Sequence, residues 1–186
     1  MVRLTTERLI LREFTEADWP ALQAIESRPD VARYQSFEPR TAKESRDYVL
    51  TAVADADAEP RMTYDLAITL RDGGLLIGRC GLGLSDETSG EALLWYTLHP
   101  EQWGHGYGTE AARAIVDFAF RELGMHRVCA DCDPANVGSW RVLEKIGMRR
   151  EGHLRESVWI KGAWADSFIY AVLDREWLPR PAIDGD

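Results

Sequence analysis

Residues 101–114, EQWGHGYGTEAARA, decide the fold, because Gly104, Gly106 and Gly108 stand immediately before a run of helical character. The first turn of a helix leaves backbone N–H groups without partners and carries a partial positive charge, so that it attracts phosphate groups. Glycines lack side chains and let such an anion approach the backbone closely. The stretch therefore predicts a loop that binds a phosphorylated ligand, although a sharp strand-to-helix turn alone would also use these glycines.

Two other phosphate-binding loops do not match these letters. A P-loop requires Lys followed by Ser or Thr after its last glycine, whereas Thr109 and Glu110 stand there. The dinucleotide fingerprint requires a third glycine at the place of Thr109. A nucleotide-binding oxidoreductase is therefore disfavoured.

The residues around the loop alternate between strand and helix patterns. Before it, 62–70, 75–84 and 91–98 read as three consecutive antiparallel strands, with RDGG as the turn between the first two. After it, apolar residues at helical spacing predict a helix that ends near Gly124. The apolar positions are Ala112, Ile115, Val116, Ala119 and Leu123.

The two ends of the chain extend this pattern. The N-terminal part predicts a strand over 8–14, a helix that starts at Thr15, and a helix over 41–58 with Thr41 and Glu44 as its capping box. The C-terminal part predicts a strand at 127–132, a helix at about 137–146 that Gly147 stops, and strands at about 149–160 and 165–173. The order predicts one α+β domain over residues 1–186, with a mixed, mostly antiparallel sheet of about seven strands and helices on both faces.

Composition narrows the class of protein. The net charge is −9, and acidic and basic residues are interleaved, so the chain has no cationic stripe to bind nucleic acid. No apolar run reaches the roughly 20 residues that span a bilayer, and the first residues lack the layout of a signal peptide. We expect a soluble, cytoplasmic protein that binds neither nucleic acid nor membrane.

Three cysteines are an odd number and fit a reducing compartment. Cys129 and Cys132 have the CxxC spacing of a redox or zinc pair, but positions three apart in a strand point to opposite faces. No second CxxC or HxxxH accompanies them. We therefore expect structural cysteines and no metal site.

Two motifs at a fixed separation carry a resemblance to a known family. They are W-G-x-G-Y-G-T-E-A at 103–111 and N-x-x-S-x-R-V-L-E-K-I-G-M at 136–148. Together with RLILREFTEADW at 8–19 and the stretch 153–177, they resemble the GNAT N-acetyltransferase superfamily, and its branch of ribosomal-protein N-terminal acetyltransferases. The resemblance covers nearly the whole chain.

The resemblance implies acetyl-CoA as the acetyl donor, and a sheet that splays open between its fourth and fifth strands. The strand that ends at Leu98 would diverge from the strand at 127–132, and the pantetheine arm would lie in the opening. Asn136 would hydrogen-bond that arm, and Ser139 would lie near the sulfur. The residues implied to bind the donor are Leu98, Trp103, Gly104, His105, Gly106, Tyr107, Gly108, Thr109, Asn136 and Ser139.

The sequence departs from the broad superfamily at two positions. Trp103 stands where many members carry Gln or Arg, which suits the ribosomal-type branch. Leu143 stands where many carry a Tyr proposed to protonate the leaving thiolate, so Ser139 is the nearest substitute, and the thiolate can also leave unprotonated.

Acetyl transfer to an amine also requires a neutral amine and a place for its proton. Candidate bases are Glu91, His99 and Asp131, each of which is also readable as an ordinary surface or turn residue. An α-amine with a pKa of about 8 demands less help than a lysine at about 10.4. We take Ser139 and Glu91 as the candidate catalytic residues.

The sequence thus predicts an acetyl-CoA-dependent N-acetyltransferase that acts by direct transfer, most simply on a protein N-terminal α-amine. A small-molecule amine and a non-catalytic acyl-CoA-binding module remain as alternatives, and specificity would lie in loops 28–41 and 153–165. Trp95 or Tyr96 is the aromatic residue expected in the cleft, while Asp166 is expected to be structural. Exposed sheet edges are compatible with a homodimer.

Overall fold

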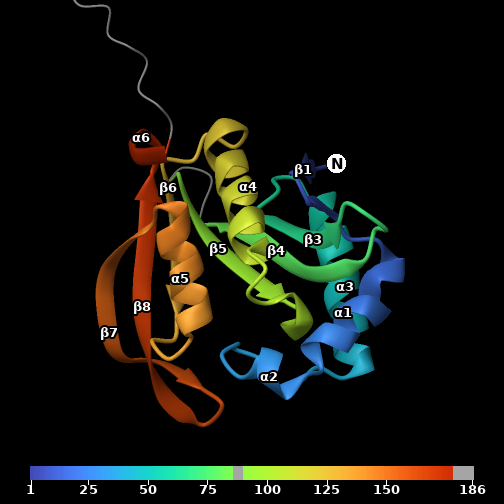
Figure 1. Ribbon diagram of the computed structural model, residues 1–186, viewed down its shortest axis with the longest axis horizontal. Coiled ribbons are helices and arrows are strands. Elements are labelled where there is room, and N and C mark those ends of the chain that lie inside the picture. The colour runs from blue at the N-terminus through green and yellow to red at the C-terminus, as the bar shows by residue number, and fades with distance from the viewer. Residues whose placement is uncertain (86–89, 178–186) are drawn as a thin grey trace, which may run out of the picture.

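The computed structural model describes residues 1–85 and 90–177. One eight-stranded sheet forms the centre of the molecule, and all its neighbouring strands are antiparallel except one parallel pair, β5 and β6 (Figure 1). The spatial order is β1 (Arg3–Thr5), β2 (Leu9–Glu13), β3 (Thr63–Leu70), β4 (Leu76–Leu84), β5 (Glu91–Leu98), β6 (Arg127–Cys132), β8 (Ala163–Leu173) and β7 (Arg149–Ile160). The predicted α+β class is confirmed, and β1 is the strand beyond the expected seven.

The helices begin and end close to their sequence signals. Thr41 and Glu44 form the predicted capping box, since the Glu44 carboxylate accepts from the Thr41 N–H at 2.8 Å and the Thr41 hydroxyl accepts from the Glu44 N–H at 3.3 Å. Gly147 ends its helix with a φ of 99°. The helices are η1 (Glu16–Asp18), α1 (Trp19–Glu26), α2 (Pro29–Ala32), α3 (Ala42–Ala56), η2 (Pro100–Gln102), α4 (Tyr107–Arg121), α5 (Val137–Ile146) and α6 (Asp174–Trp177).

Two hydrophobic clusters hold helices against the two faces of the sheet (Figure 1). On one face α4 packs with Ala112, Ile115 and Val116 on the centre of the sheet, and α5 joins it through Leu143 and Ile146. The opposite face carries α1 and α3. Leu22, Ile25 and Val49 belong to the cluster there, together with Phe14, Val31, Ala52, Ala67 and Leu76. Helices therefore cover both faces, as the sequence predicts.

The one parallel pair in the sheet opens along its length. β5 pairs with β6 only at Glu91–Arg127, Ala92–Val128 and Leu93–Cys129. Beyond these residues β5 stays paired with β4 as far as Leu98, and β6 stays paired with β8 as far as Cys132. The expected splay between these strands is confirmed, and it leaves an opening in the middle of the sheet.

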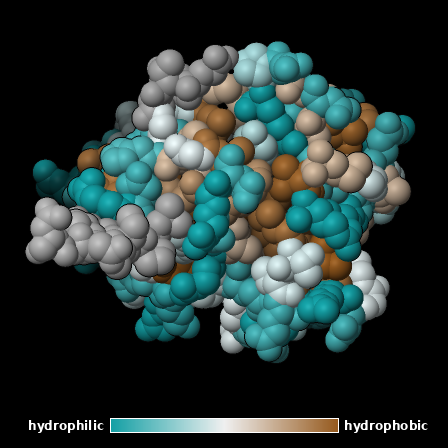
Figure 2. Space-filling model, turned by 90° about the horizontal axis from the view of Figure 1, so that it is seen from above, coloured by the Kyte–Doolittle hydropathy of each residue, from teal (hydrophilic) through white to brown (hydrophobic). Residues whose placement is uncertain are grey.

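The surface agrees with the charge-rich sequence. Figure 2 shows a face on which hydrophilic side chains predominate and hydrophobic ones gather toward the middle. Among residues 1–85 and 90–177, no helix is both long and apolar enough to cross a membrane.

Candidate functional site

A cleft of about 440 Å³ lies where β5 and β6 diverge. Five parts of the chain form its walls: the segment after α2, the middle of β5, the end of β6, one side of α5, and the β7–β8 hairpin. The lining includes both Trp95 and Tyr96, of which one was expected, together with Asn136 and Ser139 at the start of α5. The second motif and the two loops expected to carry specificity, 28–41 and 153–165, thus meet at one place.

The glycine-rich loop presents its backbone N–H groups without internal partners. Gly104 and Gly106 have φ values of 78° and 84°, a left-handed conformation that glycine adopts without strain. Within the described chain, no group accepts a hydrogen bond from the N–H groups of residues 104–109; the first such bond runs from Glu110 N to Gly106 O at 3.0 Å. The loop and first turn of α4 thus have the free donors that a diphosphate requires.

Gly108 brings this loop against the end of the cleft. A Cβ at this position would lie 3.4 Å from Leu98 Cδ1 and 3.5 Å from Val142 Cγ2. Because the residue has no side chain, the first turn of α4 packs directly on both β5 and α5. The candidate phosphate-binding loop is therefore packed against β5 and α5, the two elements whose other residues line the cleft.

The side chains that alternate with the glycines, Trp103, His105 and Tyr107, make contacts that hold the loop in its conformation. Trp103 donates from Nε1 to the carbonyl oxygen of Leu98 at 2.9 Å. His105 contacts the carbonyl oxygen of Trp103 through Nδ1 at 2.9 Å, and its ring stacks on Tyr107 with centroids 6.0 Å apart. Half of the Trp103 surface remains exposed.

Ser139 is held from two directions at the start of α5. The Asn136 side chain caps the helix by accepting from Ser139 N at 3.2 Å. The Tyr96 hydroxyl lies 2.9 Å from both the carbonyl oxygen and Oγ of Ser139. A hydroxyl carries one proton, so when the Tyr96 hydroxyl donates to the carbonyl oxygen it accepts a hydrogen bond from Ser139 Oγ. Burial raises the pKa of Tyr96 far above its usual range, which keeps that hydroxyl protonated.

Leu143 lies one turn further along α5 and also lines the cleft, with 1% of its surface exposed. It offers no proton, so at this part of the cleft wall Ser139 and Tyr96 supply the hydroxyl groups. Sequence analysis did not foresee their contact, because they are 43 positions apart and no local pattern links them.

The three candidate bases have different surroundings. Glu91 lies at the closed end of the β5–β6 pair, where its carboxylate is 2.7 Å from Arg127 Nε, and it does not line the cleft. His99 caps η2 by accepting from Glu101 N at 3.2 Å. Of the three, Asp131 alone lines the cleft, and it is exposed there. The structure therefore does not bring Glu91 and Ser139 together.

A buried cluster of charged residues lies behind Trp95, one of the aromatic residues that line the cleft. The indole of Trp95 lies against Gly81, where a Cβ would be 2.3 Å from Trp95 Cζ2. Below it Arg79 bonds Glu26 at 2.6 Å and Asp65 at 3.5 Å, and Tyr48 donates to Asp65. Burial raises the pKa of Asp65. Glycines inside a strand are the one sequence signal for such close packing.

The hairpin side of the cleft is anchored by polar contacts. Asp166 accepts from the backbone N–H of Glu156 at 2.9 Å and contacts His153 Nε2 at 2.7 Å. Lys161 donates to the carbonyl oxygen of Ala32 at 2.6 Å, which joins the hairpin to α2. These contacts give Asp166 a structural role at the edge of the cleft.

The cysteines carry free thiols and show no paired arrangement. Cys129 and Cys132 lie on opposite faces of β6, and burial raises the pKa of each to about 11. Among the described residues, no group of three His, Cys, Asp or Glu side chains is arranged to hold a metal ion.

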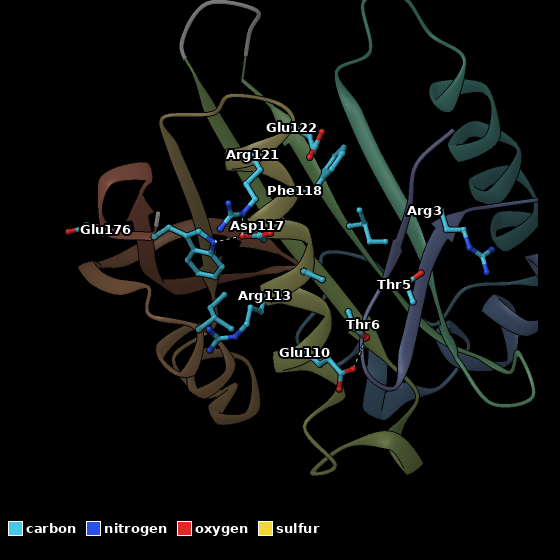
Figure 3. A pocket seen from close by; sticks show the side chains of 14 residues that line it. Arg3, Thr5, Thr6, Glu110, Arg113, Asp117, Phe118, Arg121, Glu122 and Glu176 are labelled. Carbon is cyan, nitrogen blue, oxygen red and sulfur yellow. Dashed lines mark hydrogen bonds and ion pairs between the residues drawn. The ribbon is translucent and has the colours of Figure 1, made fainter. Parts of the chain in front are cut away.

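A second hollow, of about 760 Å³, lies on the outer side of α4 (Figure 3). It is lined by β1, the turn after it and α6, and Trp177 there donates to Asp117 at 3.2 Å. It is larger than the cleft, but it contains neither Asn136 nor Ser139 and lies apart from the opening in the sheet. We therefore take the smaller cleft as the site of chemistry.

Comparison with known sequences finds relatives of this chain. A family model described as an acetyltransferase (GNAT) domain matches residues 8–149. The uncharacterized N-acetyltransferase YnaD of Bacillus subtilis is 34% identical over 178 residues, which cover 95% of this chain and 99% of that protein. The ribosomal protein uS5-alanine N-acetyltransferase of Escherichia coli is 29% identical over 86 residues, 46% of this chain and 44% of that protein.

Comparison with solved structures also finds acetyltransferases of similar fold. An acetyltransferase (GNAT family) from Bacillus anthracis has a TM-score of 0.85 at 29% identity, over 94% of this chain and all of that one. Spermidine N-acetyltransferase from Vibrio cholerae, in complex with CoA and spermine, has a TM-score of 0.80 at 20% identity, over 92% of this chain and 99% of that one. The second likeness is one of fold alone.

Proposed function

The chain belongs to the GNAT acetyltransferase family, and we propose that it moves an acetyl group from acetyl-CoA directly to a protein N-terminal α-amine. The observation that carries this proposal is the run of unpaired N–H groups at residues 104–109 beside an opening in the sheet. GNAT enzymes use acetyl-CoA, whose thioester supplies the activated acetyl group.

The loop at residues 104–109 suits the diphosphate of acetyl-CoA, and the start of α5 suits its pantetheine arm. The N–H groups of residues 104–109 would bind the diphosphate, supported by the partial positive charge at the start of α4. The side-chain amide of Asn136 still has its N–H donors, because only its oxygen is used to cap α5. Asn136 would therefore hold the pantetheine arm along the splayed edge of β5.

Ser139 and Asp131 are the residues proposed to handle protons. Ser139 lies at the cleft wall, where its hydroxyl, once it turns from Tyr96, would give its proton to the leaving sulfur and recover one from water. Asp131 is an exposed carboxylate in the cleft and would orient the acceptor amine and receive its proton directly or through water. Main-chain groups of β5 beyond Leu93, which β6 no longer pairs, would polarise the acetyl carbonyl.

The acceptor is proposed from chemistry and from relatives. An α-amine has a pKa of about 8, so a useful fraction is neutral at neutral pH without a strong base. This suits a cleft in which the candidate base is one exposed carboxylate. The name of the Escherichia coli relative specifies an alanine of ribosomal protein uS5 as its acceptor.

A small-molecule amine is the second candidate acceptor. The cleft of about 440 Å³ has room for such a molecule, and a neighbour in fold is named for spermidine. An aromatic wall at Trp95 and a carboxylate at Asp131 would also suit a polyamine.

The test is thiol release from acetyl-CoA in the presence of different amines. The panel comprises a short peptide with a free α-amine, the same peptide with a blocked α-amine, an aminoglycoside, spermidine and a free amino acid. We expect release with the free peptide and none with the blocked one. Release with spermidine or the aminoglycoside alone would transfer the proposal to small amines, and acetyl-CoA binding without release on any amine would favour a non-catalytic module.

A further inference from the structure

The turn between β1 and β2 is bonded to the first turn of α4 through one carboxylate. Glu110 Oε1 accepts from Thr6 Oγ1 at 2.6 Å and from the backbone N–H of Arg8 at 2.8 Å. The other oxygen, Oε2, is 2.7 Å from Arg8 Nε and 2.6 Å from Arg8 Nη2. Figure 3 shows Glu110 reaching from α4 toward Thr6.

The same arginine reaches the glycine loop. Arg8 Nη1 donates to the carbonyl oxygen of His105 at 2.9 Å, and the guanidinium lies over the Tyr107 ring, 4.5 Å from its centroid. In a trans peptide the C=O and the following N–H point in opposite directions. By holding the His105 oxygen, Arg8 therefore turns the N–H of Gly106 away from itself, toward the side where a ligand can take it.

The negative charge of Glu110 opposes anion binding at the start of α4, and Arg8 neutralises that charge. The charge of Glu110 in the first turn stabilises α4, but a phosphate bound at the same turn would be repelled by it. The Arg8 guanidinium is bonded to that carboxylate on one side and lies beside the loop on the other, with Nη2 3.4 Å from the position of a Cβ on Gly106. The pair leaves the phosphate-binding end of α4 without a net negative side chain.

We propose that Arg8 is a positioning residue for the diphosphate of acetyl-CoA: it neutralises Glu110 and holds the peptide between His105 and Gly106 in its binding orientation. This inference rests on the proposed role of residues 104–109. It assigns to the N-terminal turn, which lies outside both sequence motifs, a part in donor binding.

The test distinguishes two roles of the Arg8–Glu110 pair: the effect of its charges on diphosphate binding, and its contribution to holding the β1–β2 turn against α4. Arg8→Ala removes the cation and the bond to His105 but keeps the backbone bond to Glu110. Glu110→Gln keeps an oxygen for Thr6 and Arg8 N and removes the negative charge. Calorimetry measures the Kd of acetyl-CoA for both variants and for the double variant, and turnover on S-acetyl-pantetheine, a thioester without a diphosphate, is measured in parallel.

We expect Arg8→Ala to raise the Kd of acetyl-CoA about threefold to tenfold, the scale of a charge at a helix terminus. Glu110→Gln should bind acetyl-CoA as tightly as the wild type or more tightly. The double variant should recover at least half of the loss, and kcat/KM for S-acetyl-pantetheine should change less than twofold throughout. Arg121→Ala, which removes an ion pair of 2.7 Å to Asp117 at the other end of α4, is the matched control and should bind normally.

Equal losses of acetyl-CoA affinity in both single variants, with no recovery in the double variant, would overturn the inference. An ion pair that only holds the β1–β2 turn against α4 would give this result. An unchanged Kd in a folded Arg8→Ala variant would also overturn it. If Arg8→Ala does not fold, Glu110→Gln decides alone, and weaker acetyl-CoA binding in that variant contradicts the inference. Absence of acetyl-CoA binding to the wild type would instead remove the proposed function itself, and this inference with it.

Discussion

Ser139 and Tyr96 are the residues on which the proposed chemistry depends most. The hydrogen bonds of Tyr96 to both oxygens of Ser139 hold the serine at the cleft wall, where Leu143 offers no hydroxyl. Tyr96 keeps its own proton because burial raises its pKa. In the proposed mechanism Tyr96 orients Ser139 through these two hydrogen bonds.

We predict that Ser139→Ala lowers kcat about 100-fold, the scale of a general acid, with a Kd for acetyl-CoA within about threefold of the wild type. Tyr96→Phe should lower kcat less, because Ser139 keeps its hydroxyl but loses its orientation. Steady-state kinetics and calorimetry measure the two quantities. Tyr64→Phe is the control, since no described residue bonds the Tyr64 hydroxyl; a Ser139→Ala variant with wild-type kcat would rule out the proton donor.

The thiols of β6 provide a second test at this scale. Cys129 and Cys132 have pKa values raised to about 11 and are almost fully protonated at neutral pH, so they are poor nucleophiles. We predict that the Cys129→Ala, Cys132→Ala double variant keeps its kcat within about threefold and that mass spectrometry finds no acetylated cysteine during turnover. A stable acetyl-thioester on either residue would establish a covalent route.

Single residues could be placed from the sequence where a motif carried them. Asn136 and Ser139 were expected along the opening and line the cleft, and Leu143, for which the resemblance implied a tyrosine in many members, lines it too. Arg8 was not foreseen, because its partner Glu110 is 102 positions away and the contact depends on how β2 and α4 pack. Tyr96 was expected in the cleft, but its bond to Ser139 was not.

At the scale of elements, the loop before α4 is the clearest case of sequence fixing local structure. Gly106 has a φ of 84°, so any side chain there strains the backbone and would meet Arg8 Nη2. Gly124 has a φ of 65° at the other end of α4, with open space around it. The two glycines thus share a conformation but differ in their surroundings.

We predict that Gly106→Ala and Gly124→Ala each destabilise the fold by about 1 to 2 kcal/mol, because both place a Cβ in the left-handed region. Only Gly106→Ala should weaken acetyl-CoA binding, by tenfold or more, since it distorts the free N–H groups. Thermal unfolding and calorimetry measure the two effects. Equal binding by both variants would contradict the assignment of the loop.

The contact between the β1–β2 turn and α4 should depend on pH. Partial burial acts to raise the pKa of Glu110, but hydrogen bonds from Thr6 and Arg8 outweigh it and lower the pKa below the ordinary 4.5. A carboxylate with a lowered pKa stabilises the fold fully above its unfolded pKa and loses that contribution as pH falls through its folded pKa.

We therefore predict that wild type has a higher Tm than Glu110→Gln at pH 7, and that the difference shrinks as the pH is lowered from 5 to 3. Parallel thermal melts across this range measure it. A difference that stays constant down to pH 3 would show that the charge of Glu110 does not stabilise the fold.

Elements with strong periodic patterns were predicted correctly, and the short ones were not. The strands at 62–70, 75–84 and 91–98 correspond to β3, β4 and β5. The strand β1 and the helices α2 and α6 have three or four residues each, too few for a period to show, and they form because larger elements pack around them. The splay of β5 from β6 followed from the family resemblance, not from any local signal.

On the scale of the whole molecule, the sheet brings the two motifs into contact, because Gly108 at the start of α4 packs against Val142 of α5. The loop at 104–109 lies at the end of β5, Asn136 and Ser139 follow β6, and the hairpin and α2 close the cleft through Lys161. The buried cluster of Glu26, Asp65 and Arg79 could not be foreseen, because charged residues in separate segments carry no pattern that predicts their meeting.

The acceptor amine is what distinguishes the proposed function from its alternative. The most direct measurement uses a peptide with a free α-amine and one internal lysine, incubated with acetyl-CoA and purified protein, with tandem mass spectrometry to locate the acetyl group. We predict one acetyl group on the α-nitrogen, formed by the wild type and about 100-fold more slowly by Ser139→Ala. Acetylation of the lysine alone, or an unmodified peptide while spermidine is acetylated, would contradict this prediction.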